Sequence, residues 1–464
     1  MKKVFLFMLG LLLPLISFAD AWDTEYKRIE QSVIEPAFPA TVYPITKYGA
    51  KPGAKAAANQ KAINKAIATC SKKGGGTVLV AGGTFETGAI RLESNVNLRI
   101  EKGAQLNFVF EPALYPVVLT RWEGVDCYNI SPCIYAYKAN NIAITGEGTV
   151  DGGGSNETWW KWCGAPHFGW QQGTPSQRES RPLLLKYNAD EVDVKDRRFT
   201  AADCLRPQLV HFLECEKVLI ENLTFLRSPF WVLHPTLCKS VTVRGVHVIN
   251  DGPNGDGCDP ESCDGVIIED SFFNTGDDCI AVKSGRNNDG RRWNKPTENI
   301  IIRNCRMENG HGGVVIGSEI TGGCRNLFAE NCEMDSPLLD RVIRIKTNTC
   351  RGGLIENIYV RNINVGECKE AVLKINLDYD PKEVCCRGFL PIVRNINLEN
   401  VKSNKSKYGV MIVALDSVSN VYDINLKNCE FKNVQSGDYY TGRVRNLNYT
   451  HMNLFGVTPE RKKK

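Results

Sequence analysis

Four short polar clusters interrupt an apolar, β-branched stretch between residues 250 and 346. In chain order they are Asn254-Gly255-Asp256, Gly276-Asp277-Asp278-Cys279, Gly310-His311-Gly312 and Arg344-Ile345-Lys346. A background of this kind normally buries itself, so polar clusters inside it need an explanation. Together they hold three carboxylates, one imidazole and two cations, which are the groups needed for acid–base chemistry on an anionic substrate.

The adjacent carboxylates of Asp277 and Asp278 are the most unusual feature. They repel each other, and a third carboxylate at Asp256 makes ionising all three costly, so we expect the pKa of one of them to rise. A protonated and an ionised carboxylate side by side are what glycosidic cleavage requires, because one assists the leaving oxygen and the other activates water. Alone, an Asp-Asp pair is weak evidence, since most such pairs are solvated turns.

Arg344 and Lys346 are two residues apart, which on a strand directs both side chains to the same face. Outward-facing cations beside carboxylates suit a ligand that is itself a carboxylate, and arginine offers it a bidentate contact. The alternative is a structural salt bridge from these cations to Asp256, Asp277 or Asp278.

An internal repeat runs through the chain. Short strands with alternating β-branched residues recur, many of them beginning at Asn, and the second residue of each serves as an anchor. From Val218 to Leu447 the anchor spacings are 23, 25, 34, 27, 31, 38, 28 and 23 residues, and the gap from Val96 to Ile142 is 46, twice 23. A base period near 23 residues with insertions is typical of a solenoid of stacked turns.

The polar clusters fall in phase with this repeat. Asp277 and His311 each lie 11 residues after an anchor, so we expect them on neighbouring turns, about 4.8 Å apart along the stack. Asp256 falls on the preceding turn, and Arg344 and Lys346 fall on the following one. Four consecutive turns would therefore present the clusters on one face.

The predicted fold is all-β, a right-handed parallel β-helix, because each turn carries several strands and almost no helix signal. Asn at the strand corners suits this fold, since Asn tolerates left-handed turns and can form hydrogen-bonded ladders.

Residues 59–70 have helical apolar spacing and would cap the open end of the stack. We predict one domain over residues 22–464, with residues 22–39 as an irregular lead-in. Residues 152–207, rich in Trp, form a large loop insertion that is either functional or packed on the flank.

Residues 1–21 are typical of a cleavable signal peptide, with Lys2 and Lys3 before an apolar run and cleavage expected after Ala19 or Ala21. No later stretch is long and apolar enough to cross a membrane, so we expect a secreted or periplasmic monomer without membrane association. The net charge of +5 falls to about +3 without the signal, which is too mild to indicate a nucleic-acid partner.

The chain has 18 cysteines, several of them at repeat positions that hold Val or Ile elsewhere. We therefore expect most of them to be small buried apolar residues. Candidate bridges join Cys258 with Cys263, or two of Cys368, Cys385 and Cys386. No paired CxxC arrangement indicates zinc, so no metal or cofactor is predicted.

The order Asn-x-Asp, Gly-Asp-Asp, Gly-His-Gly and Arg-x-Lys on a parallel β-helix resembles the polygalacturonase family, glycoside hydrolase family 28. The resemblance runs from about Thr41 through the C-terminal turns. It implies a pectin-lyase-like solenoid and an inverting hydrolase of α-1,4-galacturonide bonds in pectin, with an acidic polysaccharide as its partner. One departure is Gly255, where many members have Thr.

The resemblance also implies roles for the clustered residues. Asp277 would be the general acid, Asp256 and Asp278 would position and deprotonate water, and His311 would tune the protonation of the acid. Arg344, Lys346 and Asn254 would bind substrate, the two cations by holding the galacturonate carboxylate.

Segments 230–235, 283–287 and 317–319 look like the exo-acting bacterial branch of that family. Lys283 and Arg286 would add positive charge for uronate groups, whereas Trp231 and His234 would either contact substrate or pack below the cleft. An exo enzyme needs one end of its groove closed, and the 152–207 insertion is our candidate wall.

Several rivals stay open. Rhamnogalacturonan and xylogalacturonan hydrolases share this framework, so the sequence does not decide the pectic substrate. A calcium-dependent pectate lyase would use Asp256, Asp259, Asp277 and Asp278 as ligands. A non-catalytic polysaccharide-binding β-helix would keep the solenoid but has no need for acids, imidazole and cations in register.

Overall fold

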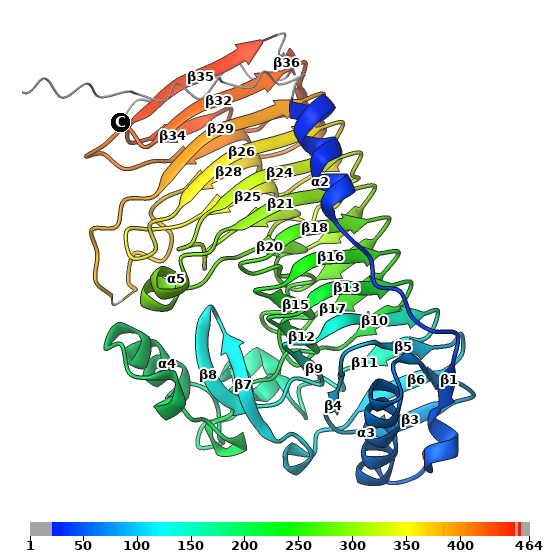
Figure 1. Cartoon of the computed structure of the whole chain (residues 1–464). Helices are drawn as coiled ribbons and strands as arrows, with labels where there is room; N and C mark the ends of the chain where they lie inside the picture. The colour runs from blue at the N-terminus through cyan, green and yellow to red at the C-terminus, as the bar shows by residue number, and fades with distance from the viewer. Residues whose placement is uncertain (1–20, 384, 451–452, 456–464) are drawn as a thin grey trace, which may run out of the picture.

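A computed structural model describes residues 21–383, 385–450 and 453–455. Most of its strands pair in parallel and stack into a coil of long sheets, so the predicted right-handed parallel β-helix is confirmed (Figure 1). The predicted signal segment lies outside the described residues, apart from Ala21. In the part of the chain that the structure describes, no helix combines the length and apolar character needed to cross a bilayer.

The longest sheet takes one strand from each turn. In order it contains β1 (Val42–Pro44), β2 (Gly76–Val80), β5 (Val96–Ile100), β10 (Asn140–Gly146), β13 (Glu216–Glu221), β16 (Lys239–Arg244), β18 (Asp264–Glu269), β21 (Thr297–Arg303), β24 (Cys324–Glu330), β26 (Leu354–Arg361), β29 (Ile392–Glu399), β32 (Val421–Lys427) and β35 (Val444–Thr450). The anchors of the repeat pair directly, as Val218 does with Val241 and Val241 with Val266.

The 46-residue gap between anchors is one turn and not two. Strands β5 and β10 are neighbours in the sheet, so no further turn lies between them. The extra residues form an antiparallel hairpin of β7 (Val117–Trp122) and β8 (Val125–Ile130), which the sequence did not predict. This hairpin lies beside the solenoid together with the 152–207 insertion (Figure 1).

Two further faces complete each turn. The second face has β3 (Thr84–Thr87), β6 (Gln105–Phe108), β11 (Thr149–Asp151), β14 (Thr224–Leu226), β17 (His247–Asn250), β19 (Phe272–Thr275) and β22 (Arg306–Asn309), then β27 (Asn364–Glu367), β30 (Lys402–Lys405), β33 (Glu430–Lys432) and β36 (Asn453–Phe455). The third has β4 (Ile90–Arg91), β9 (Ile134–Tyr137), β12 (Val210–Leu213) and β15 (Leu233–Thr236), then β20 (Ile280–Val282), β23 (Val314–Ile316), β25 (Arg341–Lys346), β28 (Ala371–Asn376), β31 (Tyr408–Val413) and β34 (Tyr439–Thr441). Single-residue bridges at Glu333 and Cys258 join the two parts of each face.

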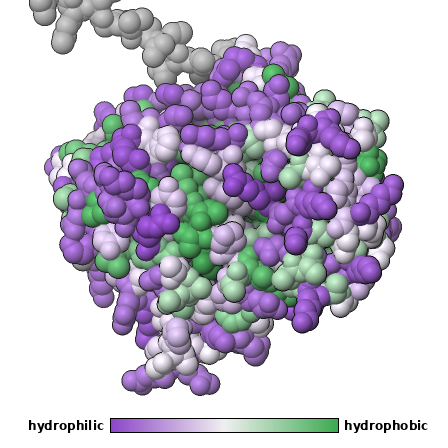
Figure 2. All heavy atoms as spheres, turned by 60° about the horizontal axis from the view of Figure 1, so that its bottom comes forward, coloured by the Kyte–Doolittle hydropathy of each residue, from purple (hydrophilic) through white to green (hydrophobic). Residues whose placement is uncertain are grey.

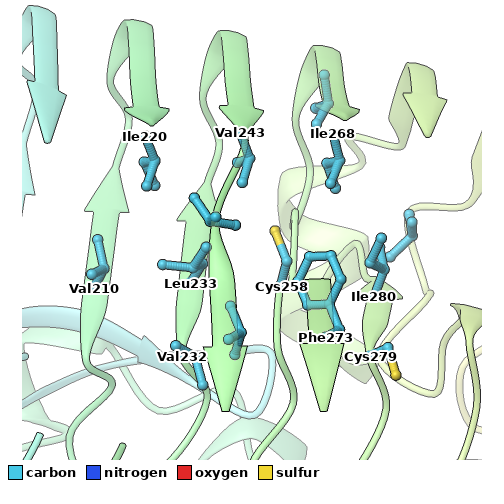
Figure 3. Packing of buried hydrophobic residues seen from close by; sticks show 14 of the residues in the cluster. Val210, Ile220, Val232, Leu233, Val243, Cys258, Ile268, Phe273, Cys279 and Ile280 are labelled. Atoms are coloured by element: carbon cyan, nitrogen blue, oxygen red, sulfur yellow. The ribbon is translucent and has the colours of Figure 1, made fainter. Parts of the chain in front are cut away.

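The core is built of rows of equivalent side chains. Because the strands pair in register, each inward position meets the same position on the next turn. Ile220, Val243 and Ile268 form one such row and are completely buried (Figure 3). Cys258 takes the place of an aliphatic residue between Leu233 and Ile280. Fourteen of the 16 free cysteines are buried, so the prediction that most are core residues is confirmed.

Asn residues turn the chain at the strand corners, as predicted. Asn299, Asn326 and Asn357 all have φ between 57° and 59°, a left-handed conformation that Asn tolerates. Their amides form a ladder, in which Asn326 Nδ2 donates to Asn299 Oδ1 at 3.2 Å and Asn357 Nδ2 donates to Asn326 Oδ1 at 3.1 Å.

Helices cover the N-terminal end and one flank. The predicted capping helix is α3 (Ala56–Lys72), which buries Ile63, Ala66 and Ile67 against the first turns. Helices α4 (Ser180–Ala189) and α5 (Asn287–Trp293) lie near the hairpin (Figure 1). Short turns are η2 (Ile45–Tyr48), η3 (Pro112–Leu114), η4 (Trp160–Cys163), η5 (Pro166–Phe168), η6 (Val194–Asp196) and η7 (Ala201–Asp203). From the capped end, the surface is mainly hydrophilic with smaller hydrophobic areas (Figure 2).

The lead-in is not irregular throughout, which corrects the prediction for residues 22–39. A π-helical turn η1 (Ala21–Glu25) continues into α2 (Tyr26–Ser32), which lies across the outside of the longest sheet (Figure 1). Trp22 packs edge-on against Phe328, with ring centroids 5.0 Å apart. The helix packs on apolar side chains on the outer face of the sheet, among them Phe328 and Tyr359. The alternation of residues within one strand does not show that neighbouring strands form such a patch.

Candidate active site

The four polar clusters meet at one place on the solenoid. Asp256 lies in the segment between β17 and β18, Asp277 and Asp278 lie between β19 and β20, His311 lies between β22 and β23, and Arg344 and Lys346 lie on β25. Strands β20, β23 and β25 are adjacent in the third face. Stacking of the turns therefore brings the clusters together, although they span 90 residues of sequence.

Three carboxylates form the centre of the site. One oxygen each of Asp256, Asp277 and Asp278 lies within 4.8 Å of the others. Asp256 and Asp278 are buried, whereas the Asp277 side chain keeps 19% of its surface exposed. Asp277 is thus the carboxylate of the three that faces the open cleft.

Asp278 is held as an anion. Burial opposes its ionisation, but Lys346 Nζ lies 2.6 Å from Oδ2 and Arg344 Nη1 lies 3.2 Å from Oδ1. These two cations outweigh burial and lower the pKa of Asp278 well below its usual range. The structural salt bridge that the sequence left open therefore exists, and the two cations also line the cleft.

Asp256 is the carboxyl whose pKa rises. Burial, followed by the nearby charge of Asp277, raises the pKa of Asp256 to about 7. Behind it lies Asp259, with no exposure, and burial together with the charge of Asp256 raises its pKa as well. Lys283 Nζ lies 3.4 Å from one oxygen of Asp256 and 3.4 Å from one oxygen of Asp259, so the two carboxyl groups share one buried cation. At mildly acidic pH at least one proton stays with this part of the site.

His311 is bound to the exposed carboxylate. Its Nδ1 lies 2.9 Å from Asp277 Oδ1, and its backbone N–H donates to the carbonyl oxygen of Asp277. This hydrogen bond, opposed by partial burial, raises the pKa of His311. The two side chains therefore form a hydrogen-bonded pair at the mouth of the site.

A cleft of about 230 Å³ opens above these groups. Of the predicted substrate-binding residues, six line it: Trp231, Asn254, Lys283, Arg286, Arg344 and Lys346. Arg181 and Arg351 bring the basic side chains in the lining to six, and they alternate with the carboxylates of Glu123, Asp256, Asp277, Glu319 and Asp380. A ligand that carries carboxylates suits such a lining.

Comparison with known proteins identifies the family. The model of the glycosyl hydrolases family 28 matches residues 195–453, more than half of the chain. The chain belongs to glycoside hydrolase family 28. A hyperthermoactive exopolygalacturonase from Thermotoga maritima is 37% identical, with a TM-score of 0.89 over 94% of this chain and 96% of the other. The family resemblance stated from the four motifs is confirmed, and the chain is a glycoside hydrolase.

Curated relatives agree with this assignment. A probable polygalacturonase from Vitis vinifera is 28% identical over 362 residues, covering 74% of this chain and 65% of that protein. An exo-poly-alpha-D-galacturonosidase from Dickeya chrysanthemi is 26% identical over 456 residues, covering 87% and 73%. The chain thus spans about two thirds or more of the length of these two relatives.

Gly255 departs from the Thr of many family 28 members for a steric reason. A Cβ atom there would lie 2.5 Å from Asn250 Nδ2 and 2.7 Å from the carbonyl oxygen of Gly252. A Cβ atom does not approach a neighbouring heavy atom this closely, and one of the two contacts is to backbone, so Thr does not fit without a shift of the backbone. The adjacent Asn254 is fixed by Arg206, whose Nη2 donates to Oδ1 at 2.7 Å.

Of the two alternatives for His234, the structure shows packing below the cleft and not contact with it. The side chain is completely buried, Nε2 lies 2.8 Å from Glu261 Oε2, and the ring lies tilted against His211 with centroids 4.6 Å apart. Burial, followed by the charge of Arg121, lowers its pKa, so the imidazole is neutral. Trp231, only three residues earlier, does reach the cleft and lies 4.4 Å from Lys283 Nζ.

Segments outside the repeat contribute to the lining of the cleft, and the sequence missed most of them. The tip of the β7–β8 hairpin meets the site where Arg286 N donates to the Gly124 carbonyl at 3.0 Å, and Gly124 has φ +79°. Beside it, Arg181 Nε of α4 donates to Glu123 Oε2 at 2.8 Å. The 152–207 insertion therefore shares this side of the cleft with the hairpin.

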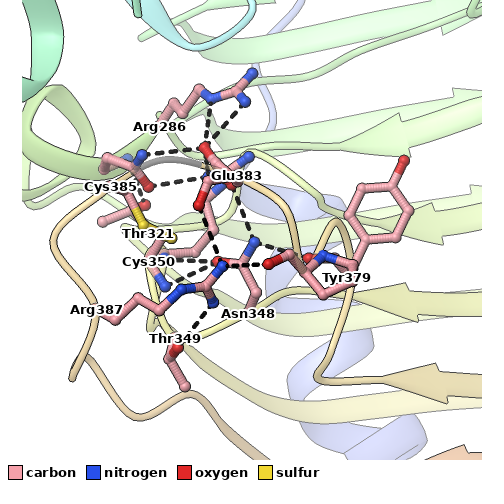
Figure 4. The surroundings of a disulfide bond; sticks show 12 residues. Arg286, Thr321, Asn348, Thr349, Cys350, Tyr379, Glu383, Cys385 and Arg387 are labelled. Carbon is pink, nitrogen blue, oxygen red and sulfur yellow. Dashed lines mark hydrogen bonds and ion pairs between the residues drawn. A yellow bond between two sulfur atoms is a disulfide. The ribbon is translucent and has the colours of Figure 1, made fainter. Parts of the chain in front are cut away.

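A loop between β28 and β29 forms another side of the cleft, with Tyr379 and Asp380 in its lining. Figure 4 shows two of its attachments: Cys385 is bonded to Cys350, and Glu383 accepts a hydrogen bond from Arg286. Glu383 also accepts hydrogen bonds from Arg351. This disulfide differs from the predicted pairings, since Cys258, Cys263, Cys368 and Cys386 are all free. The partner of Cys385 lies in a preceding turn, which sequence spacing alone does not indicate.

The charge of the site disfavours a metal ion. Asp256, Asp277 and Asp278 could offer three oxygens to a cation. However, Lys283, Arg344 and Lys346 already neutralise the two buried carboxylates. Calcium would have to bind among three fixed positive charges, which is unfavourable.

Proposed function

We propose that this family 28 enzyme hydrolyses α-1,4-galacturonide bonds of pectin, releasing sugar from a chain end with inversion at the anomeric carbon. The observation that carries this proposal is a cleft lined by six basic side chains next to three clustered carboxylates. The similarity to the Thermotoga maritima exopolygalacturonase and the Dickeya chrysanthemi exo-poly-alpha-D-galacturonosidase supports it. Hydrolysis of polygalacturonate by the purified protein, measured as new reducing ends, tests it.

In this proposal Asp277 is the general acid. It faces the cleft, and its hydrogen bond with His311 keeps a shared proton near the glycosidic oxygen. As the bond from the anomeric carbon to that oxygen breaks, the proton passes to the leaving sugar. Asn at position 277 would keep the shape of the site but could not supply this proton.

Asp278, assisted by Asp256, accepts the proton of the attacking water. In the free enzyme Asp278 is a weak base because Lys346 and Arg344 hold its charge. A galacturonate carboxylate that binds the same two cations would share them and raise the basicity of Asp278. The substrate thereby helps to prepare the base that acts on it.

Inversion is the stereochemistry that the fixed position of Asp278 favours. The three carboxylates lie closer together than the acid and base of most inverting glycosidases, a separation that retaining enzymes share. Asp278, however, is buried and held by two cations, so it is poorly placed to attack carbon, and with Asp256 it forms a site for water. Proton NMR of the first product should show the β-anomer, and an α-anomer would contradict inversion.

Action at a chain end is supported by the segments that meet around the cleft. The hairpin tip, α4 and the disulfide-bound loop contact one another through Glu123, Arg286 and Glu383, and in this proposal they block the path of a longer polymer. Early products from polygalacturonate should therefore be one short species rather than a ladder of mid-sized oligomers. Rhamnogalacturonan and xylogalacturonan serve as parallel substrates in the same product analysis.

A calcium-dependent lyase is the alternative that the charge distribution opposes. A lyase would lose activity with chelator and give an unsaturated product that absorbs in the ultraviolet. We expect neither result.

The same proposal includes export through the segment 1–21, a monomeric state, and no nucleic-acid or membrane partner. N-terminal sequencing of exported protein and size-exclusion chromatography test export and oligomeric state.

A further inference from the structure

A second cavity of about 350 Å³ adjoins the catalytic cleft. The two cavities share Asn254, Asp277 and His311 as lining residues. The far wall of the second cavity comes from the 152–207 insertion, where His167 and Phe168 lie on η5 with ring centroids 4.2 Å apart. Asp277 therefore stands at the junction between two spaces large enough to hold parts of a ligand.

The two cavities differ in charge. The catalytic cleft is lined by six basic side chains together with five carboxylates: Arg181, Lys283, Arg286, Arg344, Lys346 and Arg351, with Glu123, Asp256, Asp277, Glu319 and Asp380. Among the described residues that line the second cavity there is no Lys or Arg. Its titratable groups are His167 and the His311–Asp277 pair, in which Nδ1 lies 2.9 Å from Oδ1.

The nearest buried cation cannot serve the second cavity. Arg206 has no exposure, and its donors are committed to Gln177, Asn254 and the carbonyl oxygens of Pro229 and Pro253. A carboxylate placed in this cavity would lose water without gaining an opposite charge, which is unfavourable. Aromatic and small side chains such as Phe168 and Ala165 instead suit the C–H faces of an uncharged sugar.

We propose that the second cavity receives the leaving sugar and that this position favours a sugar without a free carboxylate. Such a sugar is either a galacturonate whose carboxyl is methyl-esterified or a neutral sugar linked to galacturonate. The inference rests on the proposed function, in which Asp277 protonates the bond between the two sugars. The terminal galacturonate occupies the catalytic cleft, and the rest of the substrate leaves past Asp277.

Matched disaccharides test the inference with the wild-type protein. The substrates are digalacturonate, its methyl ester on the leaving unit only, its methyl ester on the terminal unit only, and galacturonosyl-rhamnose. We expect kcat/KM for the leaving-unit ester to equal or exceed that of digalacturonate. The terminal-unit ester should lose about 100-fold, because its carboxylate no longer meets the cations. The rate for galacturonosyl-rhamnose, compared with the rate for the leaving-unit ester, shows whether a neutral sugar or an esterified galacturonate is the preferred leaving group.

The results distinguish a failure of this inference from a failure of the proposed function. If no disaccharide and no polygalacturonate is hydrolysed, the proposed function is wrong. If digalacturonate is hydrolysed but the leaving-unit ester and galacturonosyl-rhamnose are both slower by more than about 10-fold, only the inference is overturned.

A charge placed in the second cavity provides an independent test. Phe168 is partly exposed on a short turn, so Phe168→Arg should fold, and Phe168→Leu is the matched neutral control. Phe168→Arg should shift preference toward a free-acid leaving unit by about 10-fold, whereas Phe168→Leu should not. The penalty for the terminal-unit ester should stay unchanged in both. Equal preference in wild type and Phe168→Arg would overturn the inference.

Discussion

Lys346 brings its ammonium nitrogen to 2.6 Å from Oδ2 of Asp278, a carboxylate with no exposure to solvent. Removing the cation would leave a buried charge with Arg344 as its remaining close partner. Breaking a buried ion pair in this way costs about 3–5 kcal/mol. We therefore expect Lys346→Met to lower the melting temperature and to reduce kcat/KM by at least about 100-fold.

Two further variants make this prediction specific. Lys427→Met removes a cation from an exposed pair with Glu399 and should change stability by less than about 0.5 kcal/mol. The double variant Asp278→Asn with Lys346→Met should regain stability but not activity, because it removes the unpaired charge together with the base. A double variant as unstable as Lys346→Met would show that the ion pair is not the cause.

The Asp277 carboxyl should be essential for chemistry but not for folding. Asp277→Asn keeps the volume of the side chain and removes the proton donor, so kcat should fall by about 100- to 10,000-fold. Substrate affinity and melting temperature should change little, since this side chain is partly exposed. Asp190→Asn, at an exposed residue of the α4 C-terminus, is the control. A protein that binds polysaccharide without cleaving it would show no such difference.

The repeat made the centre of the site predictable. Turns that pair in register carry equivalent positions to the same face, so Asp277 and His311 could be placed together from a shared offset of 11 residues. The same reasoning placed the basic pair on the following turn, because Arg344 and Lys346 alternate with buried residues on one strand. Periodicity thus conveys three-dimensional neighbours directly in a solenoid.

Residues outside the repeat could not be placed in this way. Glu123 and Tyr379 reach the cleft from a hairpin and a loop whose paths depend on tertiary contacts, and neither has a phase relative to the anchors. The choice left open for His234 has a related origin. Segment 230–235 resembled the exo-acting branch, but sequence spacing could not show that the buried Glu261 is the hydrogen-bond partner of this imidazole beneath the cleft.

We expect the His311–Asp277 pair to set the alkaline limit of activity. The hydrogen bond to Asp277 raises the pKa of His311, so the pair keeps its shared proton to a higher pH than a free imidazole would. In His311→Gln, the Asp277 carboxyl group must hold the proton without an imidazole as its hydrogen-bond partner. We expect the alkaline limb of the kcat/KM profile to move to lower pH by about one unit.

His247→Gln is the control for that profile, because His247 is exposed on β17. It should leave both limbs unchanged. An alkaline limb that stays in place in His311→Gln would mean that another group supplies the proton.

Asp256 should make the folded protein less stable as pH rises. Its pKa is raised from 3.8 to about 7, so the stability it contributes is present below about pH 4 and is lost as pH rises through 7. The shift corresponds to something on the order of 4 kcal/mol. Asp256→Asn should therefore melt at a higher temperature than wild type at pH 8, while the two should be similar at pH 4.5. Asp190→Asn should follow wild type at both values, and a pH-independent difference for Asp256→Asn would contradict the assignment.

The disulfide-bound loop should couple stability to substrate affinity. The bond between Cys350 and Cys385 spans 35 residues, which corresponds to about 3–4 kcal/mol if it acts on the unfolded chain. Replacing both cysteines by Ser should lower the melting temperature. It should also raise KM, because Glu383 would no longer be held against Arg286 and Arg351.

Glu383→Gln separates the two effects. The disulfide remains, but the carboxylate whose pKa the arginines lower to about 2, against the effect of burial, is gone. Two guanidinium groups then lose their shared partner, so KM should rise by about 10-fold with a smaller change in kcat. Cys386→Ser, at the exposed neighbouring thiol, should match wild type in both respects. If the double Ser variant lowers the melting temperature while KM stays at the wild-type value, the loop supports the fold without positioning the cleft.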